Sequence, residues 1–412
     1  MINTREELLN ALAEAAELEH GLLIQYLFTA FSFKRRGDEG ISPNQQLLME
    51  DWERTILSVA HQEMYHLANV CNLLSAIGGA PRFERPNFPQ PLKKYYPFDF
   101  QLEKFNDASL YRFIVFELPE GEPPPPLPEE EKIKGLELSM FKAKFAPEPL
   151  VYNHIGELYK RIEEGFSNIP EEKLFIGPHN EQDEDAWTLR LSMHSVKDRK
   201  TALKAIKEIV EEGEGTSAAR EGSHYDKFLK VRAALKTQKE LDPLFEPART
   251  VVINPQTREH RDAGDGISLI SNPLTLKVAE LFNTTYTTML GMLIQYYNYG
   301  GESQEQREML RDSSRRMMSA LIRPLAEILT ELPISLDPAD GMAGPGFEIY
   351  GPLSLSSKID IRWTILQERF IQHIADVDDI LEHKDAYPGL SRIAKLRENF
   401  EHSLTNLQTI IA

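Results

Sequence analysis

Apolar residues recur every three to four positions through two long stretches near the start of the chain. These stretches cover residues 12–26 and 52–77. The spacing predicts two amphipathic helices. Asn3 or Thr4 is placed to cap the first helix. Residues 34–43, between the two stretches, are rich in Gly, Asp and Ser and break the pattern. We therefore expect the two helices to pack as an antiparallel hairpin.

The pattern changes over residues 81–147. This region holds aromatic residues, four consecutive prolines and a β-like run at 113–116, and it predicts a long crossover connection. Helical spacing then resumes and restarts after Gly222. We predict helices at 148–166 and 198–212, a short strand at 174–176, and a further helix through Phe228 and Val231. A helix pair, a long crossover and a second helix pair give the connectivity of a four-helix bundle.

The second half of the chain predicts a separate helical domain. Residues 243–271 are loop-like, with a candidate strand at 250–254. Apolar spacing then predicts helices at residues 274–297, 304–332, 359–381 and 391–411. The sequence thus predicts a mainly α protein with two domains, 1–235 and 236–412, the first of which carries 81–147 as an insertion.

Charge and cysteine content exclude several classes of function. The 412 residues include 64 acidic and 46 basic side chains, for a net charge of −18. Such a surface repels phosphate backbones and anionic membranes, so we expect neither nucleic acid nor membrane as a partner. A single cysteine, Cys71, excludes an internal disulfide framework and a Cys-based metal site. No apolar stretch is long enough to span a membrane and the N-terminus shows no secretion signal, so we expect a cytoplasmic protein.

Two glutamates occupy positions of the apolar stripes, where a lone carboxylate is costly to bury. Glu19 lies in the first stripe and Glu63 in the second, and His66 follows Glu63 on the same helix face. A Glu-x-x-His pair on an inward face is what a carboxylate-bridged di-metal site in a bundle needs. A buried salt bridge is the alternative. Tyr26 shares the face of Glu19 and is a candidate redox residue, with a core tyrosine as the alternative.

A complete site needs matching donors from the second helix pair. Glu157 lies beside the apolar edge of the third helix, where a surface glutamate is the alternative interpretation. The fourth helix offers several carboxylates, Glu211, Glu214 and Glu221. The residues alone do not choose among them.

Motifs along most of the chain resemble one family. The first two are Leu18-Glu-His-Gly-Leu-Leu-Ile-Gln-Tyr26 and His61-Gln-Glu-Met-Tyr-His66, the latter continued by residues 72–81. Later motifs lie at residues 155–159, 211–215, 223–225, 281–286 and 343–347. Together they resemble the ferritin-like family related to the iminophenyl-pyruvate dimer synthases of the violacein and indolocarbazole pathways.

The resemblance implies a ferritin-like four-helix bundle with a long crossover, followed by a C-terminal helical domain. It implies metal ligands at Glu19, Glu63, His66, Glu157 and His224, with Glu211 or Glu214 as the carboxylate of helix four. His224 is preferred to His154 and His194 as the second imidazole. Where the family has a glutamine after the first glutamate of helix four, this chain has Glu212.

The function implied is that of a non-haem di-metal oxidase or oxygenase. The implied cofactor is a pair of transition-metal ions, with iron preferred and manganese or an iron/manganese pair as alternatives. With dioxygen, this pair would act on a small organic molecule, such as an aromatic amino-acid derivative of secondary metabolism. No haem ligand set is apparent, so the coupling of two aryl-imine pyruvates does not carry over. The alternative is a metal-binding or iron-handling protein without an organic substrate. A homo-oligomer is compatible with either function.

Overall fold

The computed structural model describes residues 1–90, 99–119, 122–126, 128, 155–177, 182, 193, 195–213, 221–259, 266–298 and 301–411. The chain divides into two compact units. Unit 1 comprises Met1–Gly79 and Gln90–Ala248, and unit 2 comprises Ala80–Pro89 and Arg249–Ala412. The expected domain boundary after residue 235 lies within a helix of unit 1, α8 (His224–Leu241).

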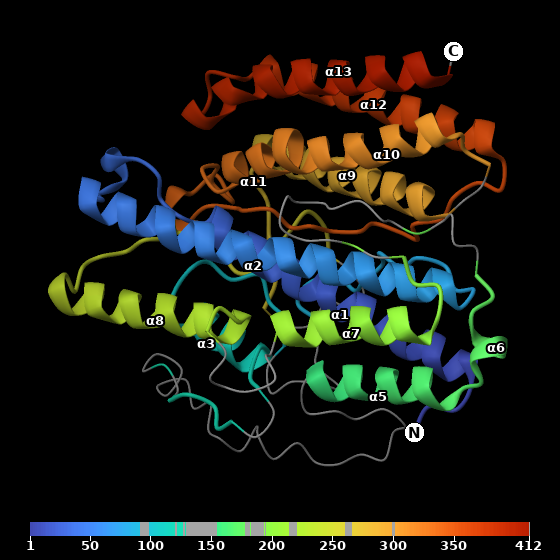
Figure 1. Ribbon diagram of the computed structural model, residues 1–412. Coiled ribbons are helices and arrows are strands. Elements are labelled where there is room, and N and C mark those ends of the chain that lie inside the picture. Colours follow the sequence, from blue (N-terminus) through green and yellow to red (C-terminus); the bar gives the residue numbers. More distant parts are fainter. Residues whose placement is uncertain are drawn as a thin grey trace. The chain divides into compact units, whose positions relative to one another are not determined.

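Two long helices of unit 1, α1 (Arg5–Phe31) and α2 (Pro43–Ala76), lie side by side (Figure 1). Thr4 caps α1: its hydroxyl accepts a hydrogen bond from the backbone N–H of Glu7, whose carboxylate accepts one from the backbone of Thr4. Ser42 caps α2 in the same manner, with a proline in the first position. Such caps satisfy amide groups that a helix start leaves unpaired. The helix pair predicted from the apolar stripes is confirmed.

The third and fourth helices of the bundle are each interrupted. The third consists of α3 (Asp107–Phe116) and α5 (Ile155–Asn168), and the fourth of α7 (Arg199–Glu212) and α8. In Figure 1, α7 and α8 follow one another along α2, which both contact. α3 packs against α8, whereas α5 packs against α1 and α7. The backbone N–H of His224 donates to the carbonyl of Gly213 at 3.3 Å, so the fourth helix resumes where it stopped.

Local predictions in unit 1 need correction. Residues 113–116, expected as β-like, end α3, because Asn106 caps this segment and its apolar residues also fit one helix face. The strand expected at 174–176 is wrong, since α6 (Glu171–Leu174) ends there. The helix expected from residue 148 is described only from Ile155, and its earlier part lies outside the described residues.

Unit 2 is also mainly helical. Its α9 (Pro273–Tyr297) contacts three further helices, α10 (Gln304–Met317), α11 (Arg323–Leu329) and α12 (Ile359–Leu381), and α12 packs against α13 (Ile393–Ile411). The single helix expected at 304–332 is broken by a π-helical turn, Met318–Ile322, which precedes Pro324.

Short elements complete the two units. Strands β1 (Pro255–Gln256) and β2 (Ser268–Leu269) pair in parallel. The strand expected at 250–254 is reduced to one bridge between Val251 and Met342. Single 3-10 turns lie at Gly37–Glu39, Pro338–Asp340 and Pro388–Arg392.

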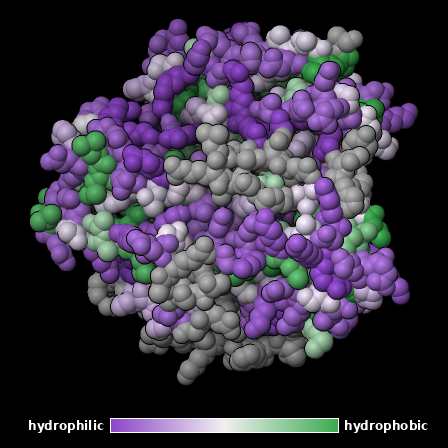
Figure 2. Space-filling model, in the orientation of Figure 1, coloured by the Kyte–Doolittle hydropathy of each residue, from purple (hydrophilic) through white to green (hydrophobic). Residues whose placement is uncertain are grey.

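Polar residues dominate the described part of the face in Figure 2, where hydrophobic residues form small, separate groups. Within the described ranges, none of the helices combines the length and the hydropathy that a membrane span requires.

A histidine is buried between helices of unit 2. His373 of α12 is 2 % exposed, and its Nε2 atom lies 3.1 Å from the hydroxyl of Thr288 on α9. That hydroxyl already donates to the carbonyl of Thr284, so the ring nitrogen is the donor. Burial, and then the charge of Arg369, lower the pKa of His373 to about 3.

This histidine is expected to make unit 2 sensitive to acid. Below the ordinary pKa of 6.5, the unfolded chain takes up a proton at this histidine and the folded protein does not. The free energy of unfolding therefore decreases as the pH decreases. The loss amounts to about 2 kcal/mol between pH 7 and pH 5. His373→Gln keeps a donor for Thr288 and should remove this loss. Urea unfolding of both proteins at the two pH values measures it, and equal losses would contradict the expectation.

Candidate metal centre

Five side chains that bind or transfer protons meet in the interior of unit 1, and none is more than 2 % exposed. α1 supplies Glu19, α2 supplies Glu63 and His66, Glu117 follows α3, and α8 begins with His224. Carboxylates at such depth need a proton or a cation as partner. The predicted burial of Glu19 and Glu63 within their apolar stripes is confirmed.

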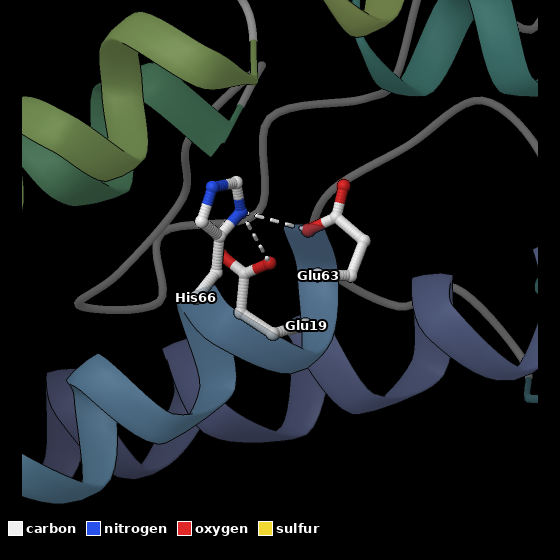
Figure 3. A group of neighbouring side chains, drawn as sticks. All are labelled: Glu19, Glu63 and His66. Atoms are coloured by element: carbon white, nitrogen blue, oxygen red, sulfur yellow. Dashed lines mark hydrogen bonds and ion pairs between the residues drawn. The ribbon is translucent and has the colours of Figure 1, made fainter. Parts of the chain in front are cut away.

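These side chains form two groups that share Glu63. In the first group, with Glu19 and His66, the Nδ1 atom of His66 lies 2.9 Å from Glu63 Oε2 and 3.6 Å from Glu19 Oε2 (Figure 3). In the second group, with Glu117 and His224, the Nδ1 atom of His224 lies 2.8 Å from Glu63 Oε1 and 3.5 Å from Glu117 Oε2. Each oxygen of Glu63 thus faces a different imidazole, which is the arrangement of a carboxylate that bridges two metal ions.

Both helix interruptions lie at the level of these groups. Glu117 is the C-terminal cap of α3, and His224 is the first residue of α8. Gly213, which ends α7, and the first two residues of α5 line a cavity together with the first group. About 10 Å³ of this cavity is open to the centre of a water molecule, which is room for one water-sized species. An ion fits there, and an aromatic molecule does not.

A tyrosine hydroxyl holds each of the two outer carboxylates. Tyr159 of α5 donates to Glu19 Oε1 at 2.5 Å, and Tyr26 of α1 donates to Glu117 Oε1 at 2.5 Å. The other oxygen of each glutamate, Oε2, faces the histidine of its group. The tyrosines therefore fix which oxygen is presented to a metal ion. The redox role of Tyr26 stays a prediction.

In the absence of metal, bound protons compensate the negative charge of the buried carboxylates. Burial, and then the charge of Glu63, raise the pKa of Glu19 to about 8. Burial also acts to raise the pKa of Glu63, but the charges of His224 and His66 outweigh it and hold this pKa well below its ordinary value. Burial acts to lower the pKa of both histidines, and the Glu63 carboxylate reverses this and raises it. These shifts favour the ionised form of Glu63 and the protonated forms of the two histidines that face it.

The donor set fits two transition-metal ions. The Nε2 atom of His66 and both ring nitrogens of His224 are buried without a well-formed hydrogen bond within the described ranges. Carboxylate oxygens combined with imidazole nitrogens suit iron, manganese or zinc better than calcium or magnesium, which prefer oxygen alone. Each group would offer one ion two carboxylates and one imidazole, with Glu63 common to both.

Two other predicted ligands, Glu157 and Glu211, do not belong to either group. Glu157 is half-buried, accepts a hydrogen bond from Arg161 at 2.8 Å, and belongs to neither group. Glu211 is paired with Lys207 at 3.6 Å, and its side chain is 32 % exposed. Glu214, like the competing His154 and His194, lies outside the described residues. Their roles as ligands stay untested.

Sequence reasoning missed Glu117. The run at 113–116 was interpreted as extended, which places Glu117 in a loop rather than on a helix face. A usable signal was present: Asn106 starts a helix, and Leu110, Phe113 and Glu117 recur at spacings of three and four. The position is the third-helix counterpart of Glu19 and Glu63.

Comparisons with known proteins agree with this geometry. A family model described as Ferritin-like matches residues 12–233, which is more than half of the chain. Dichlorochromopyrrolate synthase of Lentzea aerocolonigenes is 29 % identical, over 91 % of this chain and 39 % of its own length. The 2-imino-3-(indol-3-yl)propanoate dimerase of Chromobacterium violaceum is 25 % identical, over 87 % of this chain and 35 % of its own length. The resemblance inferred from the motifs is confirmed.

The chain therefore spans less than two fifths of the length of either relative. Among solved structures, a ferritin-like protein from Caulobacter vibrioides is 18 % identical, with a TM-score of 0.47 over 76 % of this chain and 96 % of that one.

Proposed function

Because the chain belongs to the ferritin-like family, we propose that unit 1 binds two transition-metal ions, most suitably iron. We propose further that the chain is an oxidase or oxygenase of a small organic molecule, with dioxygen as the oxidant. The observation that carries the proposal is the position of Glu63. Its two oxygens lie 2.9 and 2.8 Å from the imidazoles of two different helices.

The side chains divide the work of holding the metals. Glu19 and His66 would hold one ion and Glu117 and His224 the other, with Glu63 available to both. Two reduced ions, when bound, supply electrons for the reduction of dioxygen. Tyr159 and Tyr26 keep the outer carboxylates oriented through the hydrogen bonds that they donate. The burial of all five donors keeps bulk water away from the ions.

An aromatic amino-acid derivative is the substrate class that the relatives support. The name of one relative specifies an indole-bearing imino acid, and we propose related chemistry here without assuming the activity of those longer proteins. The cavity at the first group holds one water-sized species. Dioxygen is small enough for such a space, and we propose that the organic molecule binds beside this cavity rather than in it.

Oxygen uptake tests this function. Metal-free protein is loaded with two equivalents of Fe(II) without oxygen, and dioxygen consumption is then followed with and without aromatic amino acids and their 2-oxo acids. We expect uptake beyond the amount that oxidises the added iron, and only when an organic substrate is present. Uptake that stops once the iron is oxidised, whatever compound is added, would favour the iron-handling alternative.

A further inference from the structure

The second ring nitrogen of His66 faces a carboxylate outside the two groups. The Nδ1 atom points toward Glu63 and Glu19, so Nε2 points away from them. It lies 3.4 Å from the Oε2 atom of Glu212. Both atoms are buried and neither makes a hydrogen bond within the described ranges, so their contact is an ion pair rather than a hydrogen bond. Glu212 is the last residue of α7, and it lies at the level of His66 because the fourth helix is interrupted there.

The side chain of Gln62, on α2, lies near Glu212. Gln62 directly precedes Glu63, and it acts with His66 to lower the pKa of the Glu212 carboxyl against the effect of burial. The Nζ atom of Lys227 donates to the amide oxygen of Gln62 at 2.5 Å. An ammonium group only donates, so it fixes the oxygen of the amide on its own side. The amide NH₂ is then turned away from Lys227 and is available to the carboxylate of Glu212.

Lys227 brings a positive charge to this edge of the site. It lies on α8, three residues after His224, and is half-buried. Within the described residues no carboxylate lies within 4 Å of its Nζ atom, yet the charges of Glu212, Glu63 and Glu117 all act on it. Its contact with the neutral Gln62 is therefore its direct link to the side chains around Glu212.

The neighbouring residue shows that this arrangement is specific. Glu211 points away from His66, toward Lys207 and solvent. The ion pairs of His224 within the described ranges, with Glu63 and Glu117, both involve its Nδ1 atom, whereas His66 also has Glu212 at Nε2. An outer carboxylate on a ligand histidine orients the ring and makes it a stronger donor. Within the part of the chain that the structure describes, such a carboxylate is found at the first group.

We propose that Glu212 is the positioning carboxylate of His66, held by Lys227 through Gln62, and that it strengthens metal binding in the first group alone. This inference rests on the proposed metal centre. Lys227 and Glu212 are positioning residues, since neither offers an atom to either group. Their removal must therefore act on one metal ion and leave the other in place.

Cobalt(II) titration of the metal-free full-length chain, followed by visible absorption, tests the proposal. We expect two ions per wild-type chain. Glu212→Gln should weaken one of the two sites about 10- to 100-fold and leave the other unchanged. Lys227→Met should weaken the same site by a smaller factor. In the Glu212→Gln background, Lys227→Met should have no further effect, because it acts through Glu212. Glu211→Gln and Lys207→Met are the matched controls and should bind as wild type.

Each result has a separate meaning. If the wild type binds no cobalt, the metal centre itself is wrong. If the wild type binds two ions and Glu212→Gln behaves like Glu211→Gln, the metal centre stands and the positioning role is wrong. If Lys227→Met weakens binding equally in both backgrounds, Lys227 does not act through Glu212. Thermal melts of the metal-free variants establish that each one is folded before it is titrated.

Discussion

Replacing Glu63 with alanine is expected to abolish the binding of both metal ions. Glu63 is the one carboxylate that the two groups share, at 2.9 Å from the imidazole of His66 and 2.8 Å from that of His224. Its loss leaves each ion a single glutamate and a single imidazole. It also removes the charge that separates two cations in a buried site, so that they repel one another. Elemental analysis after reconstitution should fall from two ions per chain to none.

The matched control is another buried glutamate of the same helix. Glu53 of α2 is paired with Arg35 at 2.8 Å and takes no part in either group. Glu53→Gln should therefore retain two ions per chain. Equal metal contents in Glu63→Ala and wild type would remove the shared-carboxylate site from consideration, as would a wild type that binds no iron, manganese or zinc.

Metal loading is expected to stabilise wild-type unit 1 and to stabilise Glu19→Gln much less. Binding to the folded state alone adds about 2.7 kcal/mol at a hundredfold excess over Kd. For a unit of this size that raises the melting temperature by roughly 5 to 10 °C. The metal-free variant should melt no lower than metal-free wild type. With a pKa of about 8, Glu19 already carries a proton near neutral pH, and glutamine imitates that protonated form.

Four thermal melts measure this, with and without metal for each protein. Glu17→Gln is the control, since Glu17 lies on α1 but is only half-buried and belongs to neither group. It should show the full metal-dependent shift. Identical shifts in wild type and Glu19→Gln would mean that Glu19 is not a ligand, and the first group would lose one of its donors.

The sequence pattern predicted the side chains of the first group better than those of the second. Glu19, Glu63 and His66 lie on long uninterrupted helices, where an apolar stripe runs for many turns and makes an inward carboxylate conspicuous. His224 starts a helix after a break, so periodicity alone did not place it, and the family resemblance did. Glu117 stands at the end of a ten-residue helix, which is too short for a persuasive stripe.

The interruption of the third helix explains why Glu157 was preferred. A continuous third helix was expected to begin before residue 155 and carry the ligand. Instead, α3 ends at the level of the site, and the inward carboxylate is its C-terminal cap, Glu117. Spacing within one segment cannot reveal where two segments meet in space, because that depends on tertiary packing.

In unit 2 the long apolar stretches were informative and the short ones were not. The helix expected at 359–381 has those bounds, and the one expected at 274–297 begins one residue earlier. Short strands and turns depend on partners that are distant in sequence, as the bridge between Val251 and Met342 illustrates. The same holds for Ala80–Pro89, whose contacts are with unit 2 although it follows directly on α2 in the chain.

The two interrupted helices also bear on how such a site can diversify. In a continuous helix that runs past the proposed metal centre, an insertion would rotate every following residue onto a different face of the helix. Here the backbone hydrogen bonds of α3 and α7 already end at the site, and those of α8 begin anew there. Sequence added between these segments leaves the ligand-bearing hairpin of α1 and α2 untouched, and the entropy of a longer connection rises only slowly. The proposed metal ligands and the segments around them can thus change independently in evolution. Insertions at the two helix interruptions can alter specificity while the α1–α2 hairpin stays the same.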